Sequence, residues 1–140
     1  MILTFGFLAS AAFAQDRGVI FSKDQTKTVW GQNGSPEWTP TKKNIIALEA
    51  RLESYVSSHP YAPQGDYQGA TVANALNYGR QYMGITKKGR RFIYLNAFCE
   101  IPTFWRKKAV QVDGGGSCYF VVLFNPRTNQ FSDLRYNAAK

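Results

Sequence analysis

The sequence predicts an α+β domain of two layers, in which one main helix packs on a four-stranded antiparallel sheet of two hairpins, with one disulfide. Three observations lead to this expectation. Apolar residues recur at helical spacing over residues 40–57. From residue 80 onward the apolar pattern has the period of strands, interrupted by turn-forming residues. The two cysteines of the chain, Cys99 and Cys118, fall between the two expected hairpins.

The first 14 residues, MILTFGFLASAAFA, indicate a secretory signal peptide. They carry no charge and end in Ala12-Phe13-Ala14, the small-x-small pattern that signal peptidase accepts. The segment is too short to span a bilayer, which needs about 20 apolar residues. No Lys or Arg precedes the apolar run, which is consistent with a truncated signal. A buried N-terminal strand or helix is the alternative.

We therefore expect a periplasmic or secreted protein without a transmembrane segment, because no later stretch is apolar for long enough to be an anchor. Residues 15–38 would form an N-terminal arm, and residues 39–140 a single domain. The arm is mostly polar, with enough apolar residues for one short strand.

The helix expected over residues 40–57 begins with Thr39 as its N-cap and Pro40 at the first helical position, where the missing N–H costs nothing. Its apolar stripe consists of Ile45, Leu48, Leu52 and Val56. Ser58-His59-Pro60 ends the helix. Residues 70–76 give only a weak signal for a second short helix.

Four strands are expected after this helix, joined in pairs by the turns Lys87-Lys88-Gly89-Arg90 and Pro126-Arg127-Thr128-Asn129. They cover residues 80–86, 91–98, 117–125 and 130–137. The third strand is apolar at almost every position, which predicts a central strand covered on both faces. The fourth alternates between apolar and polar residues, as an outer strand does.

Cys99 would end the second strand and Cys118 would begin the third, so a bond between them would brace the crossing from one hairpin to the other. Two cysteines in an exported domain usually pair, and closing a loop of about 20 residues adds about 3 kcal/mol of stability. A redox-active pair would need the C-x-x-C spacing, which is absent. A zinc site would need more ligands than two thiols and the lone His59. We expect a structural disulfide, with no metal and no organic cofactor.

Positive charge is concentrated in residues 80–108, which hold eight basic residues against the single acid Glu100, within a chain of net charge +8. Such a segment attracts anionic partners. The expected partner-binding residues combine its cations with two aromatic side chains: Lys87, Lys88, Arg90, Arg91, Phe104, Trp105, Arg106, Lys107 and Lys108. The partner would be an anionic protein, glycan or lipid headgroup of the envelope, since export disfavours nucleic acid.

Two plainer interpretations compete with this binding surface. The basic hairpin would simply keep a sheet edge soluble, as lysine often does. Phe104 and Trp105 would fold back as a lid on the core.

A second binding hypothesis places a small ligand in an apolar cleft between helix and sheet, lined by Tyr82, Tyr94 and Tyr119.

Catalysis is the least favoured class of function, and the enzyme considered is a hydrolase. His59 can cap the end of the helix. The Asp-Gly-Gly-Gly-Ser run from residue 113 to residue 117 fits neither the nucleophile elbow nor the phosphate-binding loop. Surface carboxylates such as Glu49 are expected to be solvated.

Three stretches of the chain carry a resemblance: WTPTKKNIIALEARL, YGRQYMGITKKGRRFIYLNAFC and VQVDGGGSCYFVVLFNPRTNQFSDLRYNAA. They resemble a group of small exported proteobacterial proteins of unknown function, over about residues 37–139. The most specific pieces are RQYMG, IYLNAF and DGGGSCYF. The resemblance implies export and a single domain, and it brings no activity and no catalytic residues.

Overall fold

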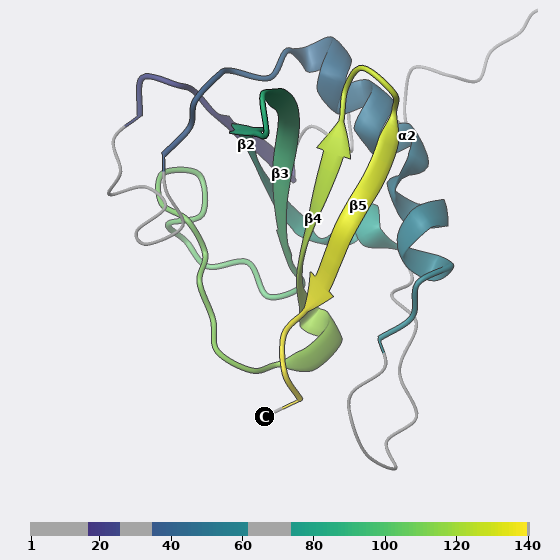
Figure 1. Ribbon diagram of the computed structural model, residues 1–140. Coiled ribbons are helices and arrows are strands. Elements are labelled where there is room, and N and C mark those ends of the chain that lie inside the picture. The colour runs from purple at the N-terminus through teal and green to yellow at the C-terminus, as the bar shows by residue number, and fades with distance from the viewer. Residues whose placement is uncertain (1–16, 26–34, 62–73, 140) are drawn as a thin grey trace, which may run out of the picture.

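The computed structural model describes residues 17–25, 35–61 and 74–139, in which one α-helix lies against a five-stranded sheet (Figure 1). The elements are β1 (Gly18–Phe21), α2 (Lys42–Ser57), β2 (Gly79–Lys87), β3 (Arg90–Phe98), β4 (Tyr119–Asn125) and β5 (Gln130–Tyr136). The strands lie side by side in chain order, from β1 to β5. The expected signal peptide, residues 1–14, lies outside the described residues.

The expected α+β arrangement of one helix, two hairpins and a disulfide is confirmed, but the sheet has a fifth strand and is mixed. Strand β1 lies parallel to β2, with Gly18 opposite Arg80 and Phe21 opposite Met83, whereas the other pairs are antiparallel. The prediction of four strands, all antiparallel, is therefore wrong. A parallel pair needs a long crossover, here through α2, so no local turn in the sequence announced it.

The helix begins two residues later than predicted, because Thr41 and not Thr39 caps it. The Thr41 hydroxyl accepts a hydrogen bond from the Asn44 N–H at 3.1 Å, and the Asn44 side chain accepts one from the Thr41 N–H at 3.0 Å. This reciprocal pair satisfies two backbone donors at once. The Thr39 hydroxyl instead accepts from the Lys23 N–H at 3.0 Å, which ties the arm to the start of the helix.

Other boundaries agree closely with the expected ones. The predicted strands differ from β2 to β5 by at most two residues at either end. Of the weak helix expected at residues 70–76, residues 70–73 lie outside the described residues, and Ala75–Asn77 form a short 3-10 helix.

The main core lies between α2 and the sheet. The predicted stripe of the helix is buried in full: Ile45, Leu48, Leu52 and Val56. It packs over alternating residues of the three central strands, namely Tyr82, Ile93, Leu95, Ala97, Phe120, Val122 and Phe124. A continuous apolar layer of this kind is the main source of stability in a domain of this size.

Trp38 joins the segment before α2 to the middle of β2. Its indole N–H donates to the Ile85 carbonyl at 2.9 Å, and the Glu37 N–H donates to the Gly84 carbonyl at 2.8 Å. A Cβ atom at Gly84 would lie 2.1 Å from the Trp38 carbonyl oxygen. Glycine is therefore required at this position, because the two backbones approach so closely.

A buried ion pair links α2 to β2 beneath the helix. Arg80 is fully buried, with its guanidinium Nη2 3.0 Å from Glu49 Oε1 and its Nη1 2.7 Å from the Tyr78 carbonyl. Its Nε donates to the Tyr82 hydroxyl at 2.9 Å, and that hydroxyl donates to Glu49.

Burial raises the pKa of Tyr82 well above its usual value; the Arg80 charge opposes this effect and Glu49 adds to it. The phenol is therefore a neutral donor to Glu49. Arg80 thus lies in the interior and not in the surface charge of residues 80–108, and Glu49 is not the solvated carboxylate that its helix position suggested.

We expect Glu49→Ala to lower the free energy of unfolding by about 3–5 kcal/mol, because it leaves the Arg80 charge buried without its carboxylate. Urea unfolding followed by circular dichroism measures this loss. The matched control is Glu53→Ala, one turn later on the exposed side of α2, where the carboxylate only accepts from the Leu76 N–H at 3.3 Å. The control should lose less than about 1.5 kcal/mol. Equal losses in the two variants would contradict this role for the ion pair.

Candidate functional site

The second face of the sheet is partly covered by the segment between the two cysteines, residues 99–118, which we call the crossing loop. The loop runs along the opposite side of the sheet from α2 (Figure 1). Ala109 packs with Phe21 and Met83, and Val110 packs with Phe98. This placement makes the crossing loop a second layer over β1 and β2.

The predicted disulfide is confirmed. Cys99 and Cys118 are bonded, with their Cα atoms 4.9 Å apart, and the Cys99 N–H donates to the Cys118 carbonyl at 2.8 Å. Cys118 ends a short 3-10 helix, Gly116–Cys118, and so does not begin β4 as expected. A Cβ atom at Gly115, where φ is +84°, would lie 2.5 Å from the ring of Tyr119, so the chain can turn here only through glycine.

Two amides on the sheet hold the middle of the crossing loop. Gln81 is fully buried, and its Nε2 donates to the carbonyls of Trp105 and Lys108 at 2.7 and 2.8 Å. Its Oε1 accepts from the Val110 N–H at 3.0 Å. Asn96 donates to that same oxygen at 3.0 Å and to the Val110 carbonyl at 2.7 Å.

Sequence reasoning missed both amides. The signal it could have used is that each amide shares its strand face with apolar residues, Gln81 with Met83 and Ile85, and Asn96 with Phe98. Nothing in the sequence says what they would bind.

The two aromatic residues proposed as anchors have opposite positions. Trp105 is 8 % exposed and packs edge-on against Phe98, with the ring centroids 6.1 Å apart. The Arg106 guanidinium lies 4.3 Å from the centroid of the Trp105 ring. Phe104 is 46 % exposed, with the Lys108 ammonium 6.0 Å from its centroid. The lid interpretation therefore describes Trp105, whereas Phe104 is open to a partner.

Exposed apolar side chains gather on the crossing loop. Among the described residues, four large apolar side chains are exposed, and three of them belong to this loop: Ile101, Phe104 and Val112. Arg106, Lys107 and Lys108 are exposed on the same loop. The loop thus offers a partner both apolar surface and positive charge.

The basic hairpin turn is exposed but does not present its cations on one face. Lys88 and Gly89 have φ values of 51° and 74°, as a two-residue hairpin turn of type I′ requires. Lys87 Nζ lies 3.6 Å from Asp133 on the second face. The Arg91 guanidinium lies 5.3 Å from the centroid of Trp38, toward the helix side.

The hairpin tip is also separated from the crossing loop. Lys87 is four residues, or about 13 Å along β2, from Met83, where the loop packs.

The cleft expected between helix and sheet is not formed by the three tyrosines. Tyr82 faces the helix and is 1 % exposed, whereas Tyr94 and Tyr119 lie on the second face of the sheet. Tyr82 pairs with Leu95, the neighbour of Tyr94 in β3, and successive residues of a strand point to opposite faces. Tyr94 and Tyr119 therefore lie on the face of the sheet away from Tyr82.

His59 has the structural role that its position suggested. Its Nδ1 lies 2.8 Å from the Tyr55 carbonyl oxygen, and its ring stacks on Tyr55 at 4.2 Å. His59 therefore caps the end of α2. Within the described part of the chain, no three His, Cys, Asp or Glu side chains lie close enough together to hold a metal ion.

Gln81→Leu should release the crossing loop, because the carbonyls of Trp105 and Lys108 lose their donors. We expect amide hydrogen exchange over residues 105–111 to become at least about tenfold faster, the effect of losing about 1.4 kcal/mol of hydrogen bonding. Gln130→Leu, at an exposed position in β5, is the control and should leave exchange in the loop unchanged. Unchanged loop exchange in Gln81→Leu would show that packing alone holds the loop.

Removing the disulfide should affect stability more than structure. We expect the double variant Cys99→Ala/Cys118→Ala to lose about 3 kcal/mol of unfolding free energy, since the unfolded chain gains loop entropy. The loop should remain docked in the folded state, because Gln81 and Asn96 still hold it. Urea unfolding and amide exchange together test both statements, and failure of the double variant to fold would contradict them.

The chain was compared with models of protein families, with curated proteins and with solved structures, and no match was found in any of the three comparisons. The resemblance of residues 37–139 to small exported proteobacterial proteins therefore stays a prediction.

Proposed function

We propose that this protein is an exported binding domain that contacts an anionic partner through the crossing loop, with the basic hairpin adding to the attraction. The observation that carries the proposal is the exposure of Phe104 beside Lys107 and Lys108 on a loop held at both ends and in its middle. A rigid loop loses little conformational freedom on binding, so its contacts contribute more of their energy to affinity.

The disulfide supports a location outside the cytoplasm. Disulfides form and persist in oxidising compartments, such as the periplasm or the extracellular medium. No helix among the described residues is long and apolar enough to cross a membrane. The disulfide is the reason that a periplasmic or secreted location is part of the proposal.

An anionic lipid surface is the partner that best suits the composition of the loop. Cations near such a surface gain about 1 kcal/mol each from the negative potential of the headgroups. Phe104, the exposed apolar side chain beside the Lys108 ammonium, can enter the interface at the same time. An acidic glycan would use the cations and could stack a sugar ring on Phe104, but it has no apolar interior into which that side chain could insert.

Vesicles of phosphatidylcholine with and without phosphatidylglycerol test this proposal by co-sedimentation. We expect binding that requires phosphatidylglycerol and weakens with salt. Lys107→Gln/Lys108→Gln should lower the partition coefficient about 30-fold, because two lysines contribute about 2 kcal/mol. Phe104→Ala should weaken binding without changing its salt dependence.

The matched control removes the same charge elsewhere. Lys42 and Lys43 are exposed in the first turn of α2, so Lys42→Gln/Lys43→Gln should bind nearly as the unmodified protein does. Equal losses in both double variants would mean that net charge, and not the crossing loop, determines binding. Absence of any preference for phosphatidylglycerol would overturn the lipid surface as partner.

A further inference from the structure

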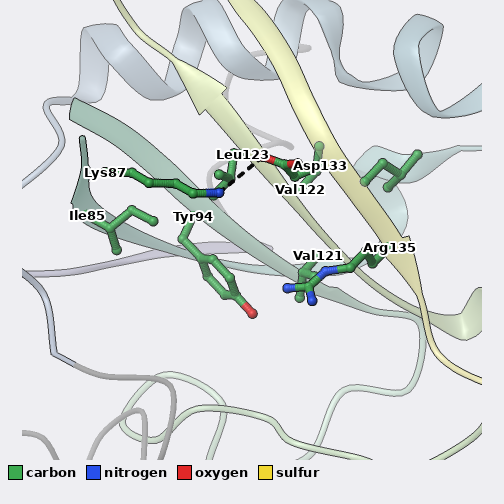
Figure 2. A pocket seen from close by; sticks show the side chains of 9 residues that line it. Ile85, Lys87, Tyr94, Val121, Val122, Leu123, Asp133 and Arg135 are labelled. Atoms are coloured by element: carbon green, nitrogen blue, oxygen red, sulfur yellow. Dashed lines mark ion pairs between the residues drawn. The ribbon is translucent and has the colours of Figure 1, made fainter. Parts of the chain in front are cut away.

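A groove of about 480 Å³ lies on the part of the second face that the crossing loop leaves open. Its apolar part comes from three adjacent strands: Ile85, Tyr94, Val121 and Leu123. Its charged residues are Lys87, Asp133 and Arg135 (Figure 2). The volume lies within the range of about 300–1,000 Å³ that is usual for small-molecule sites.

The groove begins where the crossing loop ends. Val121 is the register partner of Asn96, the residue whose amide holds Val110 of the loop. The groove residues stand on paired strands, so they are positioned by the sheet and not by the loop. A site here is therefore formed in advance and does not depend on the function proposed for the loop.

The charges along the groove do not balance. Lys87 Nζ lies 3.6 Å from Asp133 Oδ2, and both side chains are more than half exposed, at 56 % and 57 %. An exposed pair of this kind is held weakly. Arg135 extends over Val121 toward Tyr94 in Figure 2, and no Asp or Glu oxygen of the described residues lies within 4.0 Å of it.

Tyr94 adds a polar group beside this cation. Burial raises the pKa of its phenol, and the nearby Arg135 charge opposes that rise. The phenol is therefore uncharged at neutral pH and does not neutralise Arg135. Two cations against one carboxylate leave the groove with an excess of positive charge above an apolar floor.

We propose that this groove binds a small amphipathic carboxylate, with its carboxylate on Arg135 and its apolar part against Tyr94, Val121 and Leu123. A guanidinium can form two parallel hydrogen bonds to a carboxylate. These bonds would fix the charged end of the ligand, which the apolar residues of the groove alone could not do. The register of β3 and β4 sets Tyr94 directly opposite Leu123, so their side chains lie next to each other on the same face of the sheet. They form an apolar surface beside the Arg135 guanidinium.

Decanoate below its micelle concentration is a suitable probe, with decanol as its uncharged counterpart. Isothermal titration should show that decanoate binds more tightly than decanol. Arg135→Gln should weaken decanoate binding about tenfold, a loss of about 1.4 kcal/mol, and make the two ligands nearly equal, since the charged hydrogen bonds to the carboxylate are lost. Amide shifts in NMR spectra should locate the ligand at Tyr94, Val121 and Leu123.

Two control variants keep the groove intact and remove positive charge elsewhere. Arg127→Gln removes an exposed cation in the turn after β4 and should leave decanoate binding unchanged. Lys107→Gln/Lys108→Gln should also leave it unchanged, so failure of the lipid proposal and failure of this one are distinguishable. Absence of decanoate binding to the folded protein, or equal affinity of Arg135→Gln and the unmodified protein, would overturn the proposal.

Discussion

Two neighbouring residues of β2 hold the layers on the two faces of the sheet. Arg80 and Gln81 are the buried polar side chains of the described core, and each is fully shielded from solvent. Because successive residues of a strand point to opposite faces, Arg80 reaches α2 through Glu49, and Gln81 reaches the crossing loop through Trp105 and Lys108. Buried polar groups are costly unless they are paired, so each of these side chains favours one arrangement of its layer.

The sheet requires a covering layer on each of its two faces. Its central strands carry apolar residues on both faces, and the helix covers only one of them. The crossing loop covers part of the other face, although it adds no strand or α-helix that would pair the backbone groups of its middle residues there. Gln81 and Asn96 supply those partners, and the disulfide fixes the two ends. What the loop does not reach remains open as the groove over the second half of β2 and over parts of β3, β4 and β5.

Features set by neighbouring residues could be predicted from the sequence, and features set by distant pairing could not. The helix stripe and both hairpins depend on periodicity and on turns of a few residues, which are local properties of the chain. Strand β1 depends on a partner about 60 residues away, beyond a helix. The cap is an intermediate case, since Thr39 followed by Pro40 is a good start, but Thr41 has Asn44 three residues later.

The candidate site shows the same division. A basic, aromatic loop beside two cysteines could be found in the sequence, but the exposure of each side chain could not. Phe104 and Trp105 are adjacent and chemically alike, and only the packing against Phe98 makes Trp105 part of the core. Arg80 likewise counts as one more cation in the basic segment until its burial under α2 is known.

The exposed side chains of the crossing loop are not the result of a loop that failed to dock. Trp105, next to Phe104, is buried, and the carbonyls of Trp105 and Lys108 are held by a shielded amide. Phe104 therefore stays exposed on a backbone that the disulfide fixes at Cys99 before it and that Gln81 holds at Trp105 directly after it. An apolar side chain exposed on a fixed backbone has already lost part of the entropy that binding would cost. This preorganisation favours a contact surface in the loop, whereas a solubilising surface would need neither the fixed backbone nor the aromatic ring.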